Sequence, residues 1–274
     1  MAEPQAATSN AAQIEFWNST ASRAWADQYE RMDGAVAALT KELLDLAAPQ
    51  SNERVLDIGC GAGTTVLELA SRVGVGGHVL GADVSEPSVA RAQQRIAAAG
   101  LRHAEAIVAD VSAHPFTPNS FDLAFSRFGV MFFGDPQAAF TNIRRAMKPC
   151  GRLALAVFRA AGEKLWPTAP VEAVRHLLPP IPTPGPEEPG PFSWADPARV
   201  HQILEGAGFG DVTPAPLRPG NSTGRPGGRS GGGRFRHGAR PASARASQPF
   251  SSATRERARE RRGLHKSTHH ITRR

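Results

Sequence analysis

Val55-Leu56-Asp57-Ile58-Gly59-Cys60-Gly61-Ala62-Gly63 is the stretch of sequence that decides the fold. Its first four residues predict a short buried strand, and the alternating glycines that follow predict a tight turn. Five apolar residues then recur at helical spacing on one face: Val66, Leu67, Leu69, Ala70 and Val73. A strand, a glycine-rich turn and a helix form the first half of a βαβ nucleotide-binding unit. We expect a ligand to lie against the turn, because glycine has no side chain to block it and the helix N-terminus offers free N–H donors.

The spacing of the glycines narrows the kind of ligand. A dinucleotide fingerprint requires its third glycine at position 64, where this chain has Thr64. An acidic residue, Asp57, lies two positions before the first glycine, and a carboxylate there suits a ligand with a positive end. The turn resembles the first motif of the class I S-adenosylmethionine-dependent methyltransferases. The resemblance implies that Asp57, Gly59, Gly61 and Gly63 hold the amino-acid end of that cofactor.

A second strand, residues 77–83, is expected to end in the carboxylate of Asp83. Asp83 follows the glycine turn by about 20 residues, the spacing at which an acidic residue bonds a ribose in βαβ folds. Its alternative role is a helix cap, but Ser85 is better placed for that, with Pro87 just inside the helix. We therefore predict that Asp83 bonds the ribose, with Val84 beside it in the cofactor site.

The next two strands are also expected to end at the cofactor. A third strand, residues 106–109, leads to Asp110 and Val111, and the resemblance implies that Asp110 meets the adenine amino group while Val111 packs on the ring. Asp110 could instead cap the loop. The fourth strand, residues 121–126, ends at Ser126, and the apolar loop 127–133 is predicted to form a wall for cofactor and acceptor. His114 is kept only as a secondary candidate base, since a lone loop histidine is usually structural.

Residues 1–50 are expected to form a unit of helices that cover the site. One helix is predicted over residues 11–31 and a second from Asp33, which we interpret as its N-cap. Asp135-Pro136 and Asp196-Pro197 are predicted to begin two further helices. Three aromatic residues, Trp166, Phe192 and Trp194, are candidates for an acceptor pocket or for local packing. No catalytic residue and no metal ligand is assigned.

Lys148-Pro149-Cys150-Gly151 is predicted to turn the chain into a fifth strand, residues 153–158. The related proteins usually have glycine where this chain has Cys150. A type II turn requires a positive φ at that position, so cysteine would be strained unless the turn type has changed. Residues 209–212 are expected to start a sixth strand.

Charge divides the chain of 274 residues into two parts. Residues 218–274 hold 15 basic and 2 acidic residues, a net charge of +13, and the remaining residues have a net charge of −6. We expect an acidic S-adenosylmethionine-binding body over residues 51–216 and a disordered basic tail over residues 217–274. The tail resembles an RG-rich RNA-binding segment, and its composition is also typical of a message read out of frame.

Two cysteines give no disulfide framework, and no apolar run is long enough to span a bilayer. Together with the absence of a secretory signal pattern at the N-terminus, this favours the cytoplasm. No oligomeric state is predicted.

Together these features predict an α/β fold: a doubly wound, mostly parallel sheet with helices on both faces. In the resembling family an antiparallel hairpin closes the sheet, and we expect its last strand to be missing here. The resemblance, in particular to the ubiquinone and menaquinone methyltransferases, implies methyl transfer from S-adenosylmethionine to a small-molecule acceptor by in-line displacement. Three alternatives stay open: a nicotinamide-binding oxidoreductase, an RNA-binding protein acting through the tail, and an inactive methyltransferase that lacks its last strand.

Overall fold

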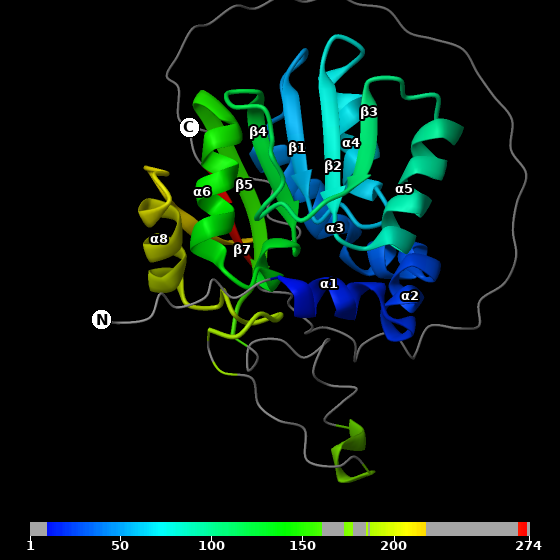
Figure 1. Cartoon of the computed structure of the whole chain (residues 1–274), viewed down its shortest axis with the longest axis vertical. Helices are drawn as coiled ribbons and strands as arrows, with labels where there is room; N and C mark the ends of the chain where they lie inside the picture. Colours follow the sequence, from blue (N-terminus) through cyan, green and yellow to red (C-terminus); the bar gives the residue numbers. More distant parts are fainter. Residues whose placement is uncertain (1–9, 161–172, 178–184, 186, 218–267, 273–274) are drawn as a thin grey trace, which may run out of the picture.

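The computed structural model describes residues 10–160, 173–177, 185, 187–217 and 268–272 of the chain. A single seven-stranded sheet forms its centre, with the strand order β3-β2-β1-β4-β5-β7-β6 (Figure 1). The first five strands in the chain pair in parallel, and β7 alone runs antiparallel, to β5 on one side and to β6 on the other. The strands are β1 (Arg54–Ile58), β2 (His78–Asp83), β3 (Ala104–Val108), β4 (Phe121–Arg127), β5 (Met147–Phe158), β6 (Pro214–Leu217) and β7 (Thr268–Thr272). The predicted doubly wound, mostly parallel sheet is confirmed.

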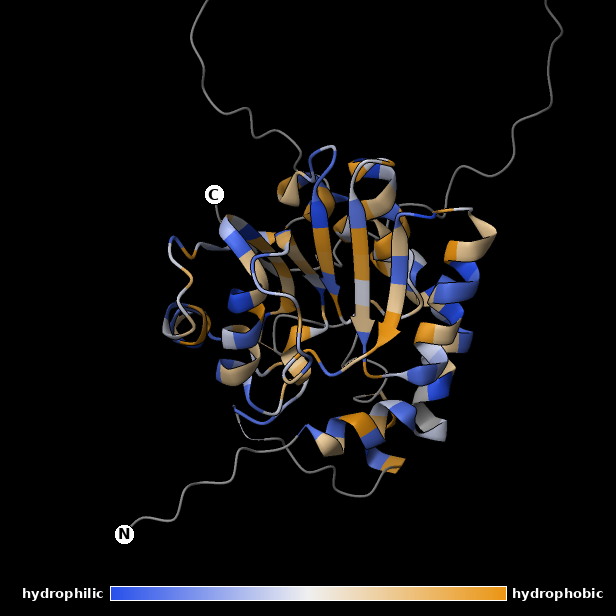
Figure 2. Cartoon of the chain, turned by 45° about the horizontal axis from the view of Figure 1, so that its top comes forward, coloured by the Kyte–Doolittle hydropathy of each residue, from blue (hydrophilic) through white to orange (hydrophobic). Residues whose placement is uncertain are grey.

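Helices cover both faces of this sheet. One buried cluster joins one strand face to the side chains of α3, α4 and α5, and a second joins the opposite face to α6 and α8. Figure 2 shows hydrophobic residues concentrated in the strands and hydrophilic residues on the covering helices. The helices are α1 (Ala11–Asn18), α2 (Thr20–Asp27), α3 (Tyr29–Ala47), α4 (Thr64–Val73), α5 (Glu86–Ala98), α6 (Pro136–Ala146) and α8 (Pro197–Gly206), with short 3₁₀ turns η1 (Val130–Phe132) and η3 (Arg175–Leu177).

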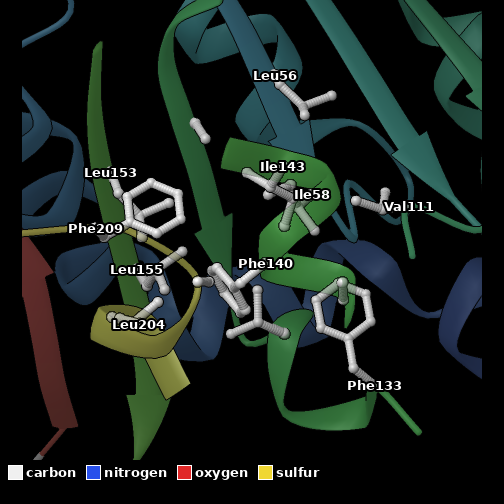
Figure 3. Packing of buried hydrophobic residues seen from close by; sticks show 14 of the residues in the cluster. Leu56, Ile58, Val111, Phe133, Phe140, Ile143, Leu153, Leu155, Leu204 and Phe209 are labelled. Carbon is white, nitrogen blue, oxygen red and sulfur yellow. The ribbon is translucent and has the colours of Figure 1, made fainter. Parts of the chain in front are cut away.

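Alternation along each strand explains why both faces can be filled. On β5, Leu153 and Leu155 belong to the cluster under α6 and α8, whereas Ala154 and Ala156 belong to the other cluster. In a strand, successive side chains point to opposite faces of the sheet. Figure 3 shows the result between β5, α6 and α8, where Leu155, Phe140 and Leu204 gather. A sheet buried on both faces leaves its strand ends as the place for a ligand.

The N-terminal helices differ from the prediction. The chain breaks at Ser19, whose backbone is extended (φ −70°, ψ 163°), and again at Gln28, so residues 11–27 form two short helices. The third helix starts at Tyr29 and runs through Asp33 without a break. The interpretation of Asp33 as an N-cap is therefore wrong, because its side chain bonds Arg127 and Thr64 instead. The break at Ser19 lets α1 lie across the carboxyl ends of the strands (Figure 1).

The other helix starts agree better with the sequence. The carboxylates of Asp135 and Asp196 accept from the backbone N–H groups of Ala138 and Ala198, so both predicted caps are confirmed. Ser85 is the residue before α5, but its hydroxyl donates to Ser88 rather than capping the helix. A residue of another helix bonds the start of α5 instead. The side-chain oxygen of Asn18 on α1 accepts from the backbone N–H of Glu86.

The end of the sheet corrects two expectations. The sixth strand is Pro214–Leu217 and not residues 209–212. Thr268–Thr272 forms the seventh strand and inserts between β5 and β6, antiparallel to both. The expectation that this closing strand would be missing is wrong, since the edge of β5 is paired from Ala154 to Phe158. The predicted basic tail falls mostly on residues 218–267, outside the described residues.

The predicted turn at residues 148–151 lies within the bounds of β5 and not before it, and the pairing of β5 with β4 is irregular there, between Phe121 and Leu123. Cys150 has a φ of +62°, in the left-handed region that glycine adopts most easily. The positive φ that the sequence predicts at Cys150 is present, and with it the strain expected for cysteine. In the part of the chain that the structure describes, no helix is long and apolar enough to cross a membrane.

Candidate functional site

A cavity of about 550 Å³ lies at the carboxyl ends of the parallel strands. The glycine turn after β1 and the ends of β2 and β4 form its floor, with Ala109 and Val111 just beyond β3, and residues of α1, α2 and α3 lie over it. This is where open α/β sheets bind ligands. Its volume is within the range of small-molecule sites.

The three glycines of the turn all have a positive φ, but they have different surroundings. A Cβ on Gly59 would come within 2.7 Å of the Cα of Gly129, and one on Gly63 within 2.8 Å of the Cβ of Ala92 on α5. A Cβ on Gly61 would meet nothing within 4 Å, and Gly61 lines the cavity. The expectation that all three keep space free for a ligand therefore needs correction: Gly59 and Gly63 permit close packing within the protein, and only Gly61 faces open space.

Asp83, at the end of β2, lines the cavity beside the glycine turn. Its two oxygens accept from backbone N–H groups: Oδ2 from Gly61 at 2.8 Å and Oδ1 from Ser85 at 2.9 Å. Burial raises the pKa of Asp83, and the N–H groups of Ser85, Gly61 and Val84 act against that rise. Each carboxylate oxygen can accept a second hydrogen bond. The arrangement fixes the carboxylate in place and leaves it able to accept from a diol.

Asp57 does not reach the cavity. Its side chain, in the middle of the buried sheet, is 1% exposed, and the hydroxyl of Thr65 on α4 donates to its Oδ2. Its Oδ1 is buried without a hydrogen-bond partner among the described residues. Burial raises the pKa of Asp57 to about 7, with Thr65 and the charge of Arg127 opposing the rise. The carboxyl group of Asp57 thus bonds α4 and does not line the cavity.

The remaining predicted residues also divide into those that line the cavity and those that lie behind it. Val84 and Val111 line the cavity, whereas Asp110 and Ser126 do not. Oδ1 of Asp110 accepts from the backbone N–H and the hydroxyl of Ser112 and from the side chain of Asn10, as a loop cap would. The hydroxyl of Ser126 donates to the carbonyl of Ile58. Five of the nine predicted residues thus line the cavity, namely Gly59, Gly61, Asp83, Val84 and Val111.

Sequence reasoning missed a charged group on the cavity wall. Arg127, at the end of β4, pairs with Asp33 of α3, with 2.5 Å between Nη2 and Oδ1. The hydroxyl of Thr64, directly after the glycine turn, donates to the other oxygen of Asp33. Arg95 of α5 donates to the hydroxyl of Thr64 at 2.8 Å and lies 4.4 Å from the ring centroid of Tyr29. Arg127 directly follows the predicted fourth strand, so the sequence did indicate that it lies near the ligand site. It gave no indication that Arg127 pairs with a residue 94 positions away.

Another part of the cavity wall is aromatic. Trp17 of α1 meets Phe132 edge to face, with ring centroids 5.1 Å apart. Phe128 stacks on Phe158 with centroids 4.3 Å apart, and all four rings line the cavity. Six of the seven residues of the loop 127–133 line the cavity: Arg127, Phe128, Gly129, Met131, Phe132 and Phe133. That this wall meets the cofactor and the acceptor stays a prediction.

Four other candidates lie away from the cavity or outside the described residues. His114 packs against Phe116, with ring centroids 4.6 Å apart, and does not line the cavity. Trp194 is fully buried against Phe140 in the core. Phe192 lies 6.3 Å from Phe158, centroid to centroid, and does not line the cavity. Trp166 is outside the described residues.

Comparison with known proteins agrees with this geometry. Residues 49–205 match a family model described as a methyltransferase domain. The aklanonic acid methyltransferase DauC of Streptomyces sp. (strain C5) is 30% identical over 184 residues, which are 62% of this chain and 80% of that protein. A demethylmenaquinone methyltransferase of Listeria monocytogenes serotype 4a is 30% identical over 131 residues, 46% of this chain and 55% of that protein.

A solved structure of a methyltransferase is also similar to this chain. Haemonchus contortus phosphoethanolamine N-methyltransferase 2, in complex with phosphomonomethylethanolamine and S-adenosylhomocysteine, has a TM-score of 0.51 and 25% identity, covering 67% of this chain and 39% of that chain. These comparisons give no support to the nicotinamide alternative. Because the matched methyltransferase domain spans more than half of the sequence, the chain belongs to the class I S-adenosylmethionine-dependent methyltransferases, enzymes that transfer a methyl group from that cofactor.

Proposed function

We propose that this chain methylates a flat, apolar, aromatic small molecule. The observation that carries the proposal is the aromatic wall formed by Trp17, Phe128, Phe132 and Phe158. Aromatic rings favour stacked or edge-to-face neighbours, worth about 0.5–1.5 kcal/mol per pair beyond burial. A planar acceptor would find such neighbours on this wall, whereas a small phosphorylated amine would not.

The residues of the floor fit the cofactor. Asp83 presents a fixed carboxylate to the ribose hydroxyls, and Gly61 leaves open space where the cofactor passes the turn. Val84 and Val111 offer apolar surface to the adenine. Asp57, Gly63, Asp110 and Ser126 support these positions from behind, through their bonds and packing within the protein.

The reaction asks little covalent chemistry of the protein. When bound, S-adenosylmethionine supplies a methyl group already activated on a sulfonium. The residues of the chain then have to align the acceptor with that methyl group, and such alignment can correspond to effective molarities of about 10⁵ M or more. The aromatic wall would hold the plane of the acceptor, and it would also exclude water from the reacting atoms.

The names of two relatives support an acceptor of this kind. One is named for demethylmenaquinone, a quinone, and the other for aklanonic acid. The chain covers 55% of the first protein and 80% of the second, and neither substrate is transferred to this chain by name.

We also propose that the reaction takes place in the cytoplasm, since Cys60 and Cys150 are both free thiols, as a reducing compartment would keep them.

The experiment compares two residues of α1. Trp17→Ala removes a ring of the wall, while Ile14→Ala shortens a side chain on the same helix that is 37% exposed and does not line the cavity. With a dihydroxynaphthalene as acceptor and S-adenosylhomocysteine release as the readout, Trp17→Ala should raise KM about tenfold, the loss expected for one aromatic contact. Ile14→Ala should not. No turnover with any fused-ring acceptor, but turnover with phosphoethanolamine, would refute the proposal.

A further inference from the structure

The ion pair between Arg127 and Asp33 lies on the cavity wall, which is otherwise largely apolar. Two charges in such a place need a physical explanation. The side chain of Arg127 is 15% exposed and that of Asp33 is 19% exposed, and both line the cavity. Removing two charges from water is expensive, and a buried pair of this kind often contributes little net stability compared with apolar residues. Burial alone therefore does not explain this pair, and what distinguishes it from a structural pair is its place on the cavity wall.

Hydrogen bonds from neighbouring side chains hold both members of the pair in place. Nη1 of Arg127 donates to the hydroxyl of Thr40 at 2.8 Å, and Oδ2 of Asp33 accepts from the hydroxyl of Thr64. Thr64 is in turn fixed by Arg95, which also donates to the carbonyl of Ala62 in the glycine turn at 2.6 Å. Both charges are thus preorganised next to the glycine turn. Arg127 has further N–H donors, and Asp33 can accept further hydrogen bonds.

The charges also fit the order of groups along the cofactor, which runs from adenine through ribose and sulfur to an amino acid. The strand order β3-β2-β1-β4 gives the cavity the same order: apolar residues near the end of β3, the carboxylate of Asp83 at the end of β2, and then Arg127 at the end of β4, paired with Asp33 of α3. The amino-acid end carries one ammonium and one carboxylate on the same carbon. A pair of opposite charges is complementary to such a zwitterion.

Resting on the proposed function, we propose that the Arg127–Asp33 pair binds the amino-acid end of the cofactor, Arg127 the carboxylate and Asp33 the ammonium. Arg127 and Asp33, which line the cavity, then hold the amino-acid end in place of Asp57. Asp57, with 1% exposure, lies behind it. Arg127 can bond a carboxylate with two parallel N–H donors, which gives the pairing both direction and strength.

The test uses two ligands that differ only in the amino-acid end. S-adenosylhomocysteine has it, and 5′-methylthioadenosine keeps the adenosine and the sulfur without it. Both are titrated by calorimetry into the full chain, into Arg127→Met and into the double variant Asp33→Asn/Arg127→Met, which leaves no charge unpaired. The control is Arg152→Met, because Arg152 forms an equally buried pair with Glu53 (18% and 15% exposed) that does not line the cavity.

We expect the Arg127 variants to lose about tenfold or more in affinity for S-adenosylhomocysteine, as for loss of a bond to a charged group. Their affinity for methylthioadenosine should stay within about twofold of the unaltered chain. Arg152→Met should change neither affinity. Unchanged affinity for S-adenosylhomocysteine, or equal losses for both ligands, would overturn the inference. If the unaltered chain binds neither ligand, the proposed function itself fails and the inference with it.

Discussion

The two ends of the parallel strands contain the same kinds of interaction, but the cavity described above lies at the carboxyl end. Arg127 pairs with Asp33 at the carboxyl end, and Arg152 pairs with Glu53 at the amino end, with similar exposure. The guanidinium of Arg152 also donates to the backbone carbonyls of residues 47 and 48, and so ties the end of α3 to β5. At the carboxyl end, the corresponding groups are bonded only in part by the protein and face empty space.

The left-handed positions show the same contrast. Gly61, at the carboxyl end, has a φ of +53° and faces the cavity. Cys150, at the amino end, has a φ of +62° in a turn whose next residue, Gly151, is packed against Met147. A strained turn or a buried ion pair is therefore no sign of a site by itself. The space around it decides whether it binds a ligand or holds the fold.

The largest expected effect comes from filling that space at Gly61. Gly61→Val should abolish binding of S-adenosylhomocysteine, measured by calorimetry, because the branched side chain would project into the cavity. The control is Gly100→Val, between α5 and β3 at the amino end, where the φ of +65° is similar and a Cβ would also meet nothing within 4 Å. Both variants should lose about 1–2 kcal/mol of stability from the backbone angle. Tight binding by Gly61→Val would place the ligand elsewhere.

An intermediate effect is expected at Asp57 and concerns stability against pH. The pKa of Asp57 is about 7 in the folded chain, against 3.8 for an unperturbed aspartate, so its contribution to stability is complete below pH 3.8 and is lost as the pH rises to 7. The loss is roughly 4 kcal/mol. Asp57→Asn cannot ionise, so urea unfolding should show a smaller fall in stability between about pH 4.5 and 8.5 than in the unaltered chain. Parallel curves for the two proteins would show that Asp57 is ionised throughout.

The smallest effect is expected at Cys150. Cys150→Gly should raise the free energy of unfolding by about 1 kcal/mol, because glycine adopts the left-handed region without strain, less the entropy that glycine loses on folding. Affinity for S-adenosylhomocysteine should not change, since the turn is at the opposite end of the strands from the cavity. A fall in stability would mean that the cysteine side chain has contacts that outweigh the strain.

The sequence predicts best what depends on neighbouring residues. The strand, turn and helix from Val55 to Val73 and the caps at Asp135 and Asp196 are local features, and the structure confirms them. Asp83 is placed in the cavity by its position at the end of a parallel strand. In each case the pattern and the geometry are set by the same few residues.

What the sequence does not predict depends on distant parts of the chain. Asp33 has the local pattern of a cap, and only its meeting with Arg127 shows its role. Residues 268–272 pair with β5 and β6 across a long connection, and no local pattern indicates that. Asp57 is assigned to the ligand by resemblance, but its burial depends on how α4 packs over the sheet, through the bond from Thr65.

The central claim, that the carboxyl end binds the cofactor through Asp83, has one direct test. S-adenosylhomocysteine is titrated into the unaltered chain, into Asp83→Asn and into Asp122→Asn, whose aspartate also accepts a backbone N–H, from Arg54, but at the amino end. Asparagine is chosen over alanine because it keeps the shape of the side chain and can still accept one of the two backbone bonds, from Gly61 or Ser85, that Asp83 accepts. Binding should weaken by about 1.5–3 kcal/mol for Asp83→Asn and stay unchanged for Asp122→Asn. Equal affinity in all three proteins would contradict the claim.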